Sequence, residues 1–222
     1  MKIIVTGDIH AQFGQLNTFI NNKKPDILLC CGDFGYFPDE KLYSLKRIKP
    51  KDTKIYWCPG NHERWDLLEE RFGRRGLIPI EIKPNIFYCP IGSYLKIEGK
   101  NILFIGGADS IDKDSRIIGI DWFPQEILNM NDVDFILNNS KERVDIIISH
   151  TCPDCFDMSR TERFDKWNDP SRKALDIILK QLNPKLYFFG HWHFSLKGKF
   201  KGTYWECLND IPFTNWWKEI KW

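Results

Sequence analysis

The sequence has 222 residues and a mass of 26.3 kDa, which is enough for one substantial hydrophobic core. The 32 lysines and arginines nearly balance the 30 aspartates and glutamates, and the formal net charge of +2 argues against a basic, nucleic-acid-wrapping protein. Hydrophobic residues make up 42% of the chain, which excludes intrinsic disorder, and no apolar run approaches the roughly 18 residues of a membrane span. The first eight residues become polar too early for a signal peptide. We therefore expect a cytoplasmic, single-domain protein over residues 1–222 that makes no membrane contact.

Alternating apolar and amphipathic segments predict the secondary structure. Strands are expected at 2–6, 26–31, 54–58, 80–82, 86–89, 94–98, 101–105, 144–149, 186–189, 195–200 and 203–208. Helices are expected at 15–22, 40–48, 65–72 and 171–182. Strands and helices alternate in the first part of the chain, whereas short connections join the strands in the middle and at the end. This order predicts an α/β (α+β) fold in which two sheets face each other with helices outside.

Seven cysteines are present, and two of them, Cys152 and Cys155, form a C-x-x-C pair. This spacing occurs in zinc and redox sites, but no second pair is present to complete a zinc site with four ligands. We therefore expect reduced structural thiols in a reducing compartment.

Polar side chains follow five of the predicted strands, and all five histidines of the chain are among them. They are Asp8 and His10 after 2–6, Asp33 after 26–31, Asn61 and His62 after 54–58, His150 after 144–149, and His191 and His193 after 186–189. Ligands of open α/β sheets bind at the carboxyl ends of the strands, so we expect these side chains to converge. One histidine in such a place would usually be structural, but five together indicate a site.

This set offers oxygen and imidazole ligands and no thiolate, which suits manganese, iron, zinc, cobalt or nickel better than calcium. Asp8 and His10, like His191 and His193, lie two residues apart and therefore share one face of an extended segment. Seven candidate ligands (Asp8, His10, Asp33, Asn61, His150, His191 and His193) exceed the needs of one tetrahedral ion. The sequence therefore predicts a binuclear centre.

The same motifs, in the same order, resemble those of the calcineurin-like metallophosphoesterase superfamily, in its small bacterial and phage form. They read Gly7-Asp8-Ile9-His10, Gly32-Asp33, Gly60-Asn61-His62-Glu63, His150 and Gly190-His191-Trp192-His193. The resemblance implies a four-layer αββα sandwich of two mixed sheets. It further implies that Asp8, His10 and His193 hold one metal ion, that Asn61, His150 and His191 hold the other, and that Asp33 bridges them. His62 matches the general acid.

Two departures from the family pattern narrow the expected activity. His10 is followed by Ala11 instead of glycine, which removes no ligand. Gly32-Asp33 lacks the Asp-Arg pair that follows it in protein serine/threonine phosphatases, so a protein phosphatase is the less expected subclass.

We therefore expect a hydrolase of phosphate monoesters or diesters with two divalent transition metal ions, manganese first and iron, zinc, nickel or cobalt as alternatives. The ions would acidify a bridging water, whose hydroxide attacks phosphorus while His62 protonates the leaving oxygen. His62, Asp33 and Asn61 are the expected catalytic residues. A metal-dependent nuclease and a catalytically silent scaffold of the same fold are the alternatives. The near-neutral charge and the lack of an extra capping domain count against the nuclease.

The expected partner is a small phosphorylated molecule, and the sequence does not identify it or predict an oligomeric state. Arginine suits phosphate by geometry, and three arginines lie near the motifs, namely Arg64, Arg116 and Arg160. Long connections at the ligand edge of a sheet commonly carry specificity, so we expect segments 109–122 and 151–169 to flank the metals without contributing ligands.

Overall fold

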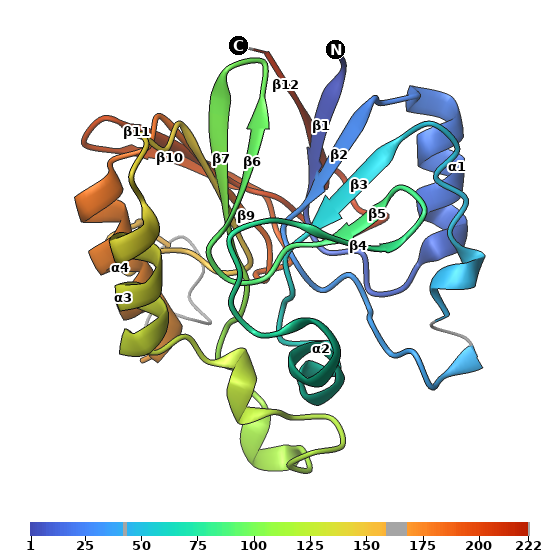
Figure 1. Ribbon diagram of the computed structural model, residues 1–222, viewed down its shortest axis with the longest axis horizontal. Coiled ribbons are helices and arrows are strands. Elements are labelled where there is room, and N and C mark those ends of the chain that lie inside the picture. Colours follow the sequence, from blue (N-terminus) through green and yellow to red (C-terminus); the bar gives the residue numbers. More distant parts are fainter. Residues whose placement is uncertain (42–43, 159–167, 222) are drawn as a thin grey trace.

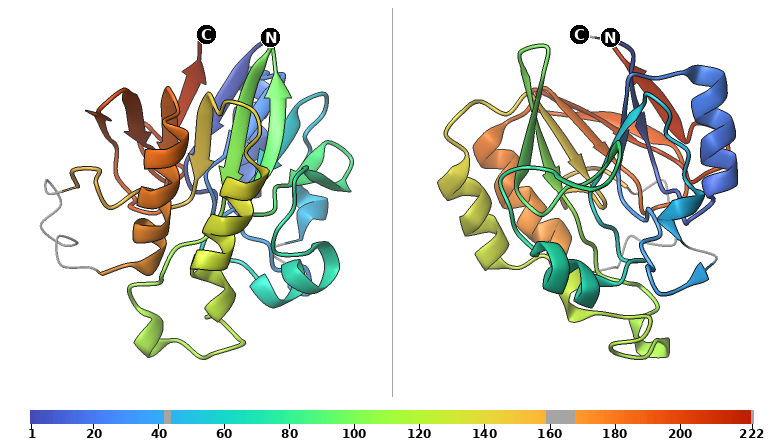
Figure 2. Two further views of the ribbon diagram at one scale, coloured as in Figure 1. Left: turned by 60° about the vertical axis from the view of Figure 1, so that its left-hand side comes forward. Right: turned by 45° about the vertical axis from the view of Figure 1, so that its right-hand side comes forward.

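The computed structural model describes residues 1–41, 44–158 and 168–221. In this part of the chain, two six-stranded mixed sheets face each other and helices cover their outer sides (Figure 1, Figure 2). The first sheet has the order β12-β1-β2-β3-β5-β4 and the second the order β10-β11-β9-β8-β7-β6. The two facing sheets predicted from the sequence are confirmed.

The first five strands along the chain form one sheet and the next six form the other, and the last strand, β12, returns to the first sheet. The first sheet comprises β1 (Ile3–Thr6), β2 (Ile27–Cys30), β3 (Lys54–Trp57), β4 (Ile80–Lys83), β5 (Ile86–Tyr88) and β12 (Trp217–Ile220). The second comprises β6 (Ser93–Ile97), β7 (Lys100–Ile105), β8 (Ile146–Ser149), β9 (Leu186–Phe189), β10 (Leu196–Phe200) and β11 (Thr203–Cys207). The helices are α1 (Phe13–Lys23), α2 (Trp65–Phe72), α3 (Met130–Asn139) and α4 (Pro170–Leu182). None of these helices is long and apolar enough to cross a lipid bilayer.

Three apolar layers hold the sandwich together. Ile3 and Val5 of β1 meet Phe104 of β7 and Ile148 of β8 in the layer between the sheets. The alternate side chains of the first sheet pack against α1, and those of the second pack against α3 and α4. The central strands of both sheets are covered on both faces. Each of them is therefore a continuous apolar run in the sequence.

The parallel strands set the position of the polar residues. β1, β2 and β3 pair in parallel in the first sheet, and β7, β8 and β9 do so in the second. Their carboxyl ends therefore lie along one edge of each sheet, which is where the motif residues begin.

One predicted helix is wrong. Of the described residues in 40–48, none is α-helical: Leu45–Arg47 form a 3₁₀ turn, Lys41 is also of the 3₁₀ type, and residues 42 and 43 lie outside the described part of the chain. The side chain of Asn17 on α1 binds the carbonyl of Arg47 at 2.9 Å and the amide of Lys49 at 2.8 Å, so this chain segment is tied to α1. The carbonyl of Arg47 and the amide of Lys49 therefore do not form the hydrogen bonds of an α-helix. The sequence reasoning also assigned neither α3 nor β12.

Candidate metal centre

Two glycines allow the site loops to approach each other closely. A Cβ atom on Gly60 would lie 2.0 Å from Oδ1 of Asp33, and one on Gly190 would lie 2.0 Å from Oδ1 of Asp8. Both carboxylates therefore pack directly on the backbone of another motif, which only glycine permits. The backbone amides take part as well, since His62 N–H donates to Asp33 Oδ1 at 2.9 Å and His191 N–H donates to Asp8.

One group of donor atoms comes from Asp8, His10, Asp33 and His193. These four residues each offer one ligand atom within 4.8 Å of the others. Nε2 of His10 lies 3.0 Å from Nε2 of His193, and the latter lies 3.3 Å from Oδ2 of Asp8. Such a group of oxygen and imidazole donors fits a divalent transition metal ion.

A second group of donor atoms adjoins the first. Oδ1 of Asn61 lies 2.8 Å from Nε2 of His150 and 3.0 Å from Nδ1 of His191. Asp33 faces both groups, because its Oδ1 lies 3.3 Å from Nε2 of His150 and its Oδ2 lies 3.7 Å from Nε2 of His10. All seven candidate ligands named from the sequence are thus brought together.

The hydrogen bonds behind the second group show what it can hold. The Nδ1–H of His150 donates to the carbonyl of Cys31 at 3.0 Å, so Nε2 is the ring nitrogen that remains to bind a metal ion. The amide nitrogen of Asn61 donates to Oγ of Ser110 at 3.0 Å, so its Oδ1 is directed toward the centre. Oδ1 of Asn61 and Nε2 of His150 face each other at 2.8 Å, an arrangement in which both atoms could bind one cation. The donor set fits a metal.

The pKa values of Asp33, His191 and His193 reflect how closely these side chains pack. Burial raises the pKa of Asp33, but the neighbouring histidines, His150 first among them, outweigh burial and hold it well below its usual range. The contact with Asp8 raises the pKa of His193 to about 9, although burial opposes this. Burial lowers the pKa of His191 well below its usual value, and His150 adds to the effect. The centre thus concentrates negative charge on Asp33, which histidines surround.

Backbone conformation is unusual at this edge. His10, Asp33, His191 and His193 have φ angles of 47°, 41°, 69° and 51°, in the left-handed region that side-chain-bearing residues seldom adopt. Such strain persists only where the surrounding structure fixes it, and it is common at functional sites. Here the glycine contacts and the amide bonds to Asp8 and Asp33 supply that support.

The calcineurin-like phosphoesterase family model matches residues 1–195, which span every motif residue of the centre. The chain belongs to the calcineurin-like phosphoesterase family. Among curated relatives, it is 24% identical to the lariat debranching enzyme of Schizosaccharomyces pombe over 87% of this chain and 48% of that protein. It is 26% identical to lariat debranching enzyme A of Xenopus laevis over 87% of this chain and 43% of that protein. The chain thus spans about half the length of these relatives.

The fold of this calcineurin-like phosphoesterase is also found in a solved structure of low sequence identity. GAP50, described as the anchor in the inner membrane complex of Plasmodium, superposes with a TM-score of 0.50. It is 13% identical, and the match covers 93% of this chain and 70% of that one. This likeness concerns the fold alone.

The three arginines named from the sequence have different positions. Nη2 of Arg116 lies 3.1 Å from Nε2 of His62, and its side chain is 9% exposed. Arg64 instead forms a two-pronged ion pair with Asp66, at 2.9 and 2.7 Å. Arg160 lies outside the described residues. Of the two arginines that are described, Arg116 is the one in contact with a motif histidine of this phosphoesterase.

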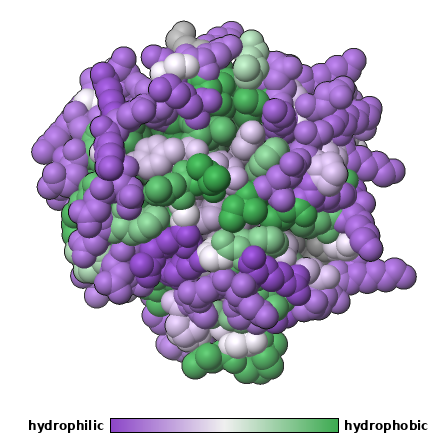
Figure 3. All heavy atoms as spheres, in the orientation of Figure 1, coloured by the Kyte–Doolittle hydropathy of each residue, from purple (hydrophilic) through white to green (hydrophobic). Residues whose placement is uncertain are grey.

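The loop that carries Arg116 has two distinct surfaces. Its base meets the centre through Ser110 and Arg116. Its tip is apolar, and Figure 3 shows this patch at the lower end of the molecule, where Figure 1 places the connection between β7 and α3. The exposed side chains there are Ile111, Ile117, Ile118 and Ile120.

Three residues around the centre were assigned no role from the sequence. Oγ of Ser110 donates to buried Glu126, which also accepts the Ser110 amide at 3.0 Å. The carboxylate of Glu63 accepts the amides of Gly35 and Gly60 at 3.0 and 2.6 Å. Glu63 belongs to the Gly60-Asn61-His62-Glu63 motif, which is a signal for its importance. No local pattern links Ser110 to Glu126, 16 residues later.

Proposed function

We propose that this protein hydrolyses phosphate monoesters or diesters at a centre of two divalent transition metal ions. Asp8, His10 and His193 would hold one ion, Asn61, His150 and His191 would hold the other, and Asp33 would bridge them. The observation that carries this proposal is the position of Asp33, whose two oxygens face the two donor groups separately. Oxygen and imidazole donors suit several divalent transition metals, and manganese is the first of them to test, before iron, zinc, nickel and cobalt.

When bound, the metals would supply an activated water and neutralise charge on the phosphoryl group. His62 would act as the general acid and protonate the leaving oxygen. Nε2 of His62 contacts Arg116. Because an arginine can only donate hydrogen bonds, Nε2 accepts in this arrangement. Arg116 would therefore turn from His62 toward the phosphoryl oxygens when substrate arrives, and Nε2 would take up a proton from solvent, which it then donates to the leaving oxygen.

Two observations bear on the alternatives. The presence of all seven candidate ligands together with His62 counts against a catalytically silent scaffold. The similarity to lariat debranching enzymes, which covers 87% of the chain, keeps a metal-dependent nuclease as the second candidate. The seven cysteines are free thiols, consistent with the proposed cytoplasmic location and a structural role for Cys152 and Cys155.

Metal removal and return tests the proposal directly. Protein stripped with EDTA should hydrolyse neither p-nitrophenyl phosphate nor bis(p-nitrophenyl) phosphate, and added Mn²⁺ should restore activity. Isothermal titration calorimetry should show two Mn²⁺ ions per chain, because Asp33 presents one oxygen to each donor group. Failure to bind any transition metal in excess would contradict the proposal and favour the scaffold.

Ser110→Ala should weaken metal binding by about tenfold to a hundredfold, the usual cost of removing a group that orients a ligand. Without the Ser110 hydroxyl, the Asn61 amide can rotate and turn Oδ1 away from His150. The dissociation constant for Mn²⁺, measured by calorimetry on stripped protein, checks this. Ser115→Ala is the matched control, because that hydroxyl is exposed and donates to the carbonyl of Asp112. Equal affinities in the two variants would show that Ser110 does not orient Asn61.

A further inference from the structure

The inner face of the second sheet extends beyond the first sheet along β9, β11 and β10. Leu186 and Phe188 of β9 point into the layer between the sheets. Tyr204 and Glu206 of β11 are their register partners and therefore lie on the same side. Lys199 and Lys197 of β10 continue this row as the partners of Tyr204 and Glu206. Tyr204 is 57% exposed, so this part of the face has no cover from the first sheet.

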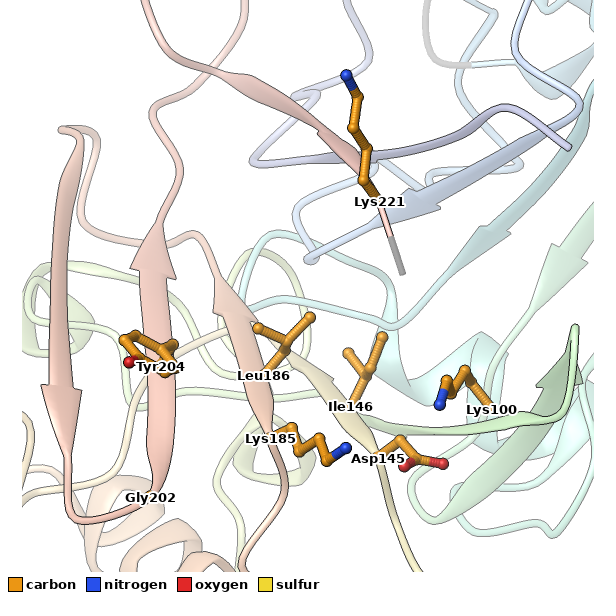
Figure 4. A pocket seen from close by; sticks show the side chains of 8 residues that line it. All are labelled: Lys100, Asp145, Ile146, Lys185, Leu186, Gly202, Tyr204 and Lys221. Atoms are coloured by element: carbon orange, nitrogen blue, oxygen red, sulfur yellow. The ribbon is translucent and has the colours of Figure 1, made fainter.

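Two adjoining cavities hollow this face. One, of about 440 Å³, is lined by Lys100, Asp145, Ile146, Lys185, Leu186, Gly202, Tyr204 and Lys221 (Figure 4). The other, of about 390 Å³, is lined by Leu186, Phe188, Lys197, Gly198, Lys199, Tyr204, Trp205 and Glu206. They share Leu186 and Tyr204, and together they form one groove, which we call the lysine groove.

The lysine groove carries a surplus of positive charge. Five lysines line it, and in the described parts of the chain no carboxylate pairs with Lys100, Lys185, Lys197 or Lys221. The two acidic residues of the groove have other partners. Asp145 lies 3.9 Å from Arg143 and accepts the amide of Asn101 at 3.1 Å, and Glu206 lies 3.4 Å from Lys218. The net charge of +2 for the whole chain conceals this local concentration.

The groove runs along β10 and β11 to the edge where β7, β8 and β9 begin, opposite the strand ends that carry the candidate metal centre. β10 begins at Leu196, three residues after His193, and its lysines lie along its length. The groove ends near Lys185, which immediately precedes β9, and Lys100 at the start of β7. At about 3.3 Å per residue, the five residues of β10 span roughly 16 Å, a length that several backbone phosphates of one strand can follow.

We propose that the lysine groove binds a single-stranded nucleic acid, with backbone phosphates on the lysines and a base stacked on Tyr204. A positive groove with an exposed aromatic ring is the arrangement by which proteins hold single strands without reading their sequence. Nζ of Lys199 lies 4.7 Å from the centroid of the Tyr204 ring, so a base would stack on the other face of this ring. Tyr204 favours a nucleic acid over inorganic polyphosphate or an acidic peptide, neither of which has a base to stack. As a statement about the substrate, this inference rests on the proposed phosphoesterase function, but as a statement about binding it stands alone.

Binding of a single strand to the groove is measured in the presence of EDTA, so that the strand is not hydrolysed and the result does not depend on catalysis. Fluorescence anisotropy of a labelled 12-nucleotide single strand compares wild type with the variant Lys185→Glu/Lys197→Glu/Lys221→Glu. The triple variant should bind at least about tenfold more weakly, and the slope of log affinity against log salt should fall by about 2, at 0.7 per lost phosphate contact. The control Lys46→Glu/Lys49→Glu/Lys173→Glu has the same net charge change on exposed sites away from the groove. Equal losses in both variants would overturn the inference.

Tyr204 separates a nucleic acid from other polyanions. Tyr204→Ala should weaken binding of the single strand about fivefold or more, whereas Tyr204→Phe should retain it, because stacking needs only the ring. Competition by polyphosphate as strong as by the strand, with no effect of Tyr204→Ala, would overturn the assignment. If the triple variant does not fold, Lys185→Glu against Lys173→Glu gives the same comparison.

Hydrolysis of bis(p-nitrophenyl) phosphate by the wild-type protein is measured in parallel. This measurement distinguishes a failure of the lysine groove from a failure of the proposed function. Hydrolysis without strand binding would overturn the groove and leave the proposed function standing. Strand binding without hydrolysis would overturn the proposed function and leave the groove standing.

Discussion

Replacing Asp33 with asparagine should lower hydrolysis of p-nitrophenyl esters by a factor on the order of a thousand, because a shared charge that offsets two cations is lost. The substitution keeps the shape of the side chain, and its oxygen can still accept the His62 amide that Asp33 holds at 2.9 Å. Folding should therefore survive while metal binding does not. Calorimetry with Mn²⁺ and circular dichroism separate these two effects.

Asp134→Asn serves as the control for this substitution, because Asp134 is exposed on α3 and changes the charge equally. It should leave both metal content and activity at wild-type levels. An Asp33→Asn protein that binds two Mn²⁺ ions with wild-type affinity would remove the argument for a shared carboxylate.

His62→Ala should lower the rate by about 10²- to 10⁴-fold on esters with poor leaving groups, the usual contribution of a general acid. The loss should shrink toward p-nitrophenyl esters, because p-nitrophenolate leaves with little protonation. Metal content should stay at the wild-type level, since His62 belongs to neither donor group. Rates for a series of aryl and alkyl phosphate esters, plotted against leaving-group pKa, provide the measurement.

A loss that is uniform across that series would mean that His62 orders the loop and does not transfer a proton. The ring of His62 packs edge-on against His10 at a centroid distance of 5.3 Å, so a purely structural role is a real competitor. The slope of the leaving-group plot separates the two roles, whereas the rate on one ester would not.

Local sequence signals predicted the bounds of some elements closely. Helix α2 spans 65–72 as expected, and β9 spans 186–189 as expected. Both elements have strong local signals. The apolar residues of α2 have helical spacing, and β9 is an apolar run followed by a glycine. The motif residues at the strand ends converge because parallel strands place their carboxyl ends together.

The sequence failed where distant side chains decide the local structure. Asn17 holds the backbone at Arg47 and Lys49 away from a helix, although these residues lie about 30 positions along the chain. The difference between Arg64 and Arg116 has the same origin. Arg64 pairs with Asp66, two residues away. Arg116 pairs with Asp112, four residues away, and also reaches His62 across 54 positions. Both arginines stand near motifs in the sequence, and only the fold separates them.

The candidate ligands come from both halves of the sandwich, and this has a thermodynamic consequence. Asp8, His10, Asp33 and Asn61 follow strands of the first sheet, while His150, His191 and His193 follow strands of the second. Any cation bound by this set of ligands would link the two sheets at one edge. Ligand that binds only the native state at a hundred times its dissociation constant adds about 2.7 kcal/mol to the free energy of unfolding. Heat resistance and metal supply would then rise and fall together, so depletion of the metal would leave a protein that is both inactive and short-lived.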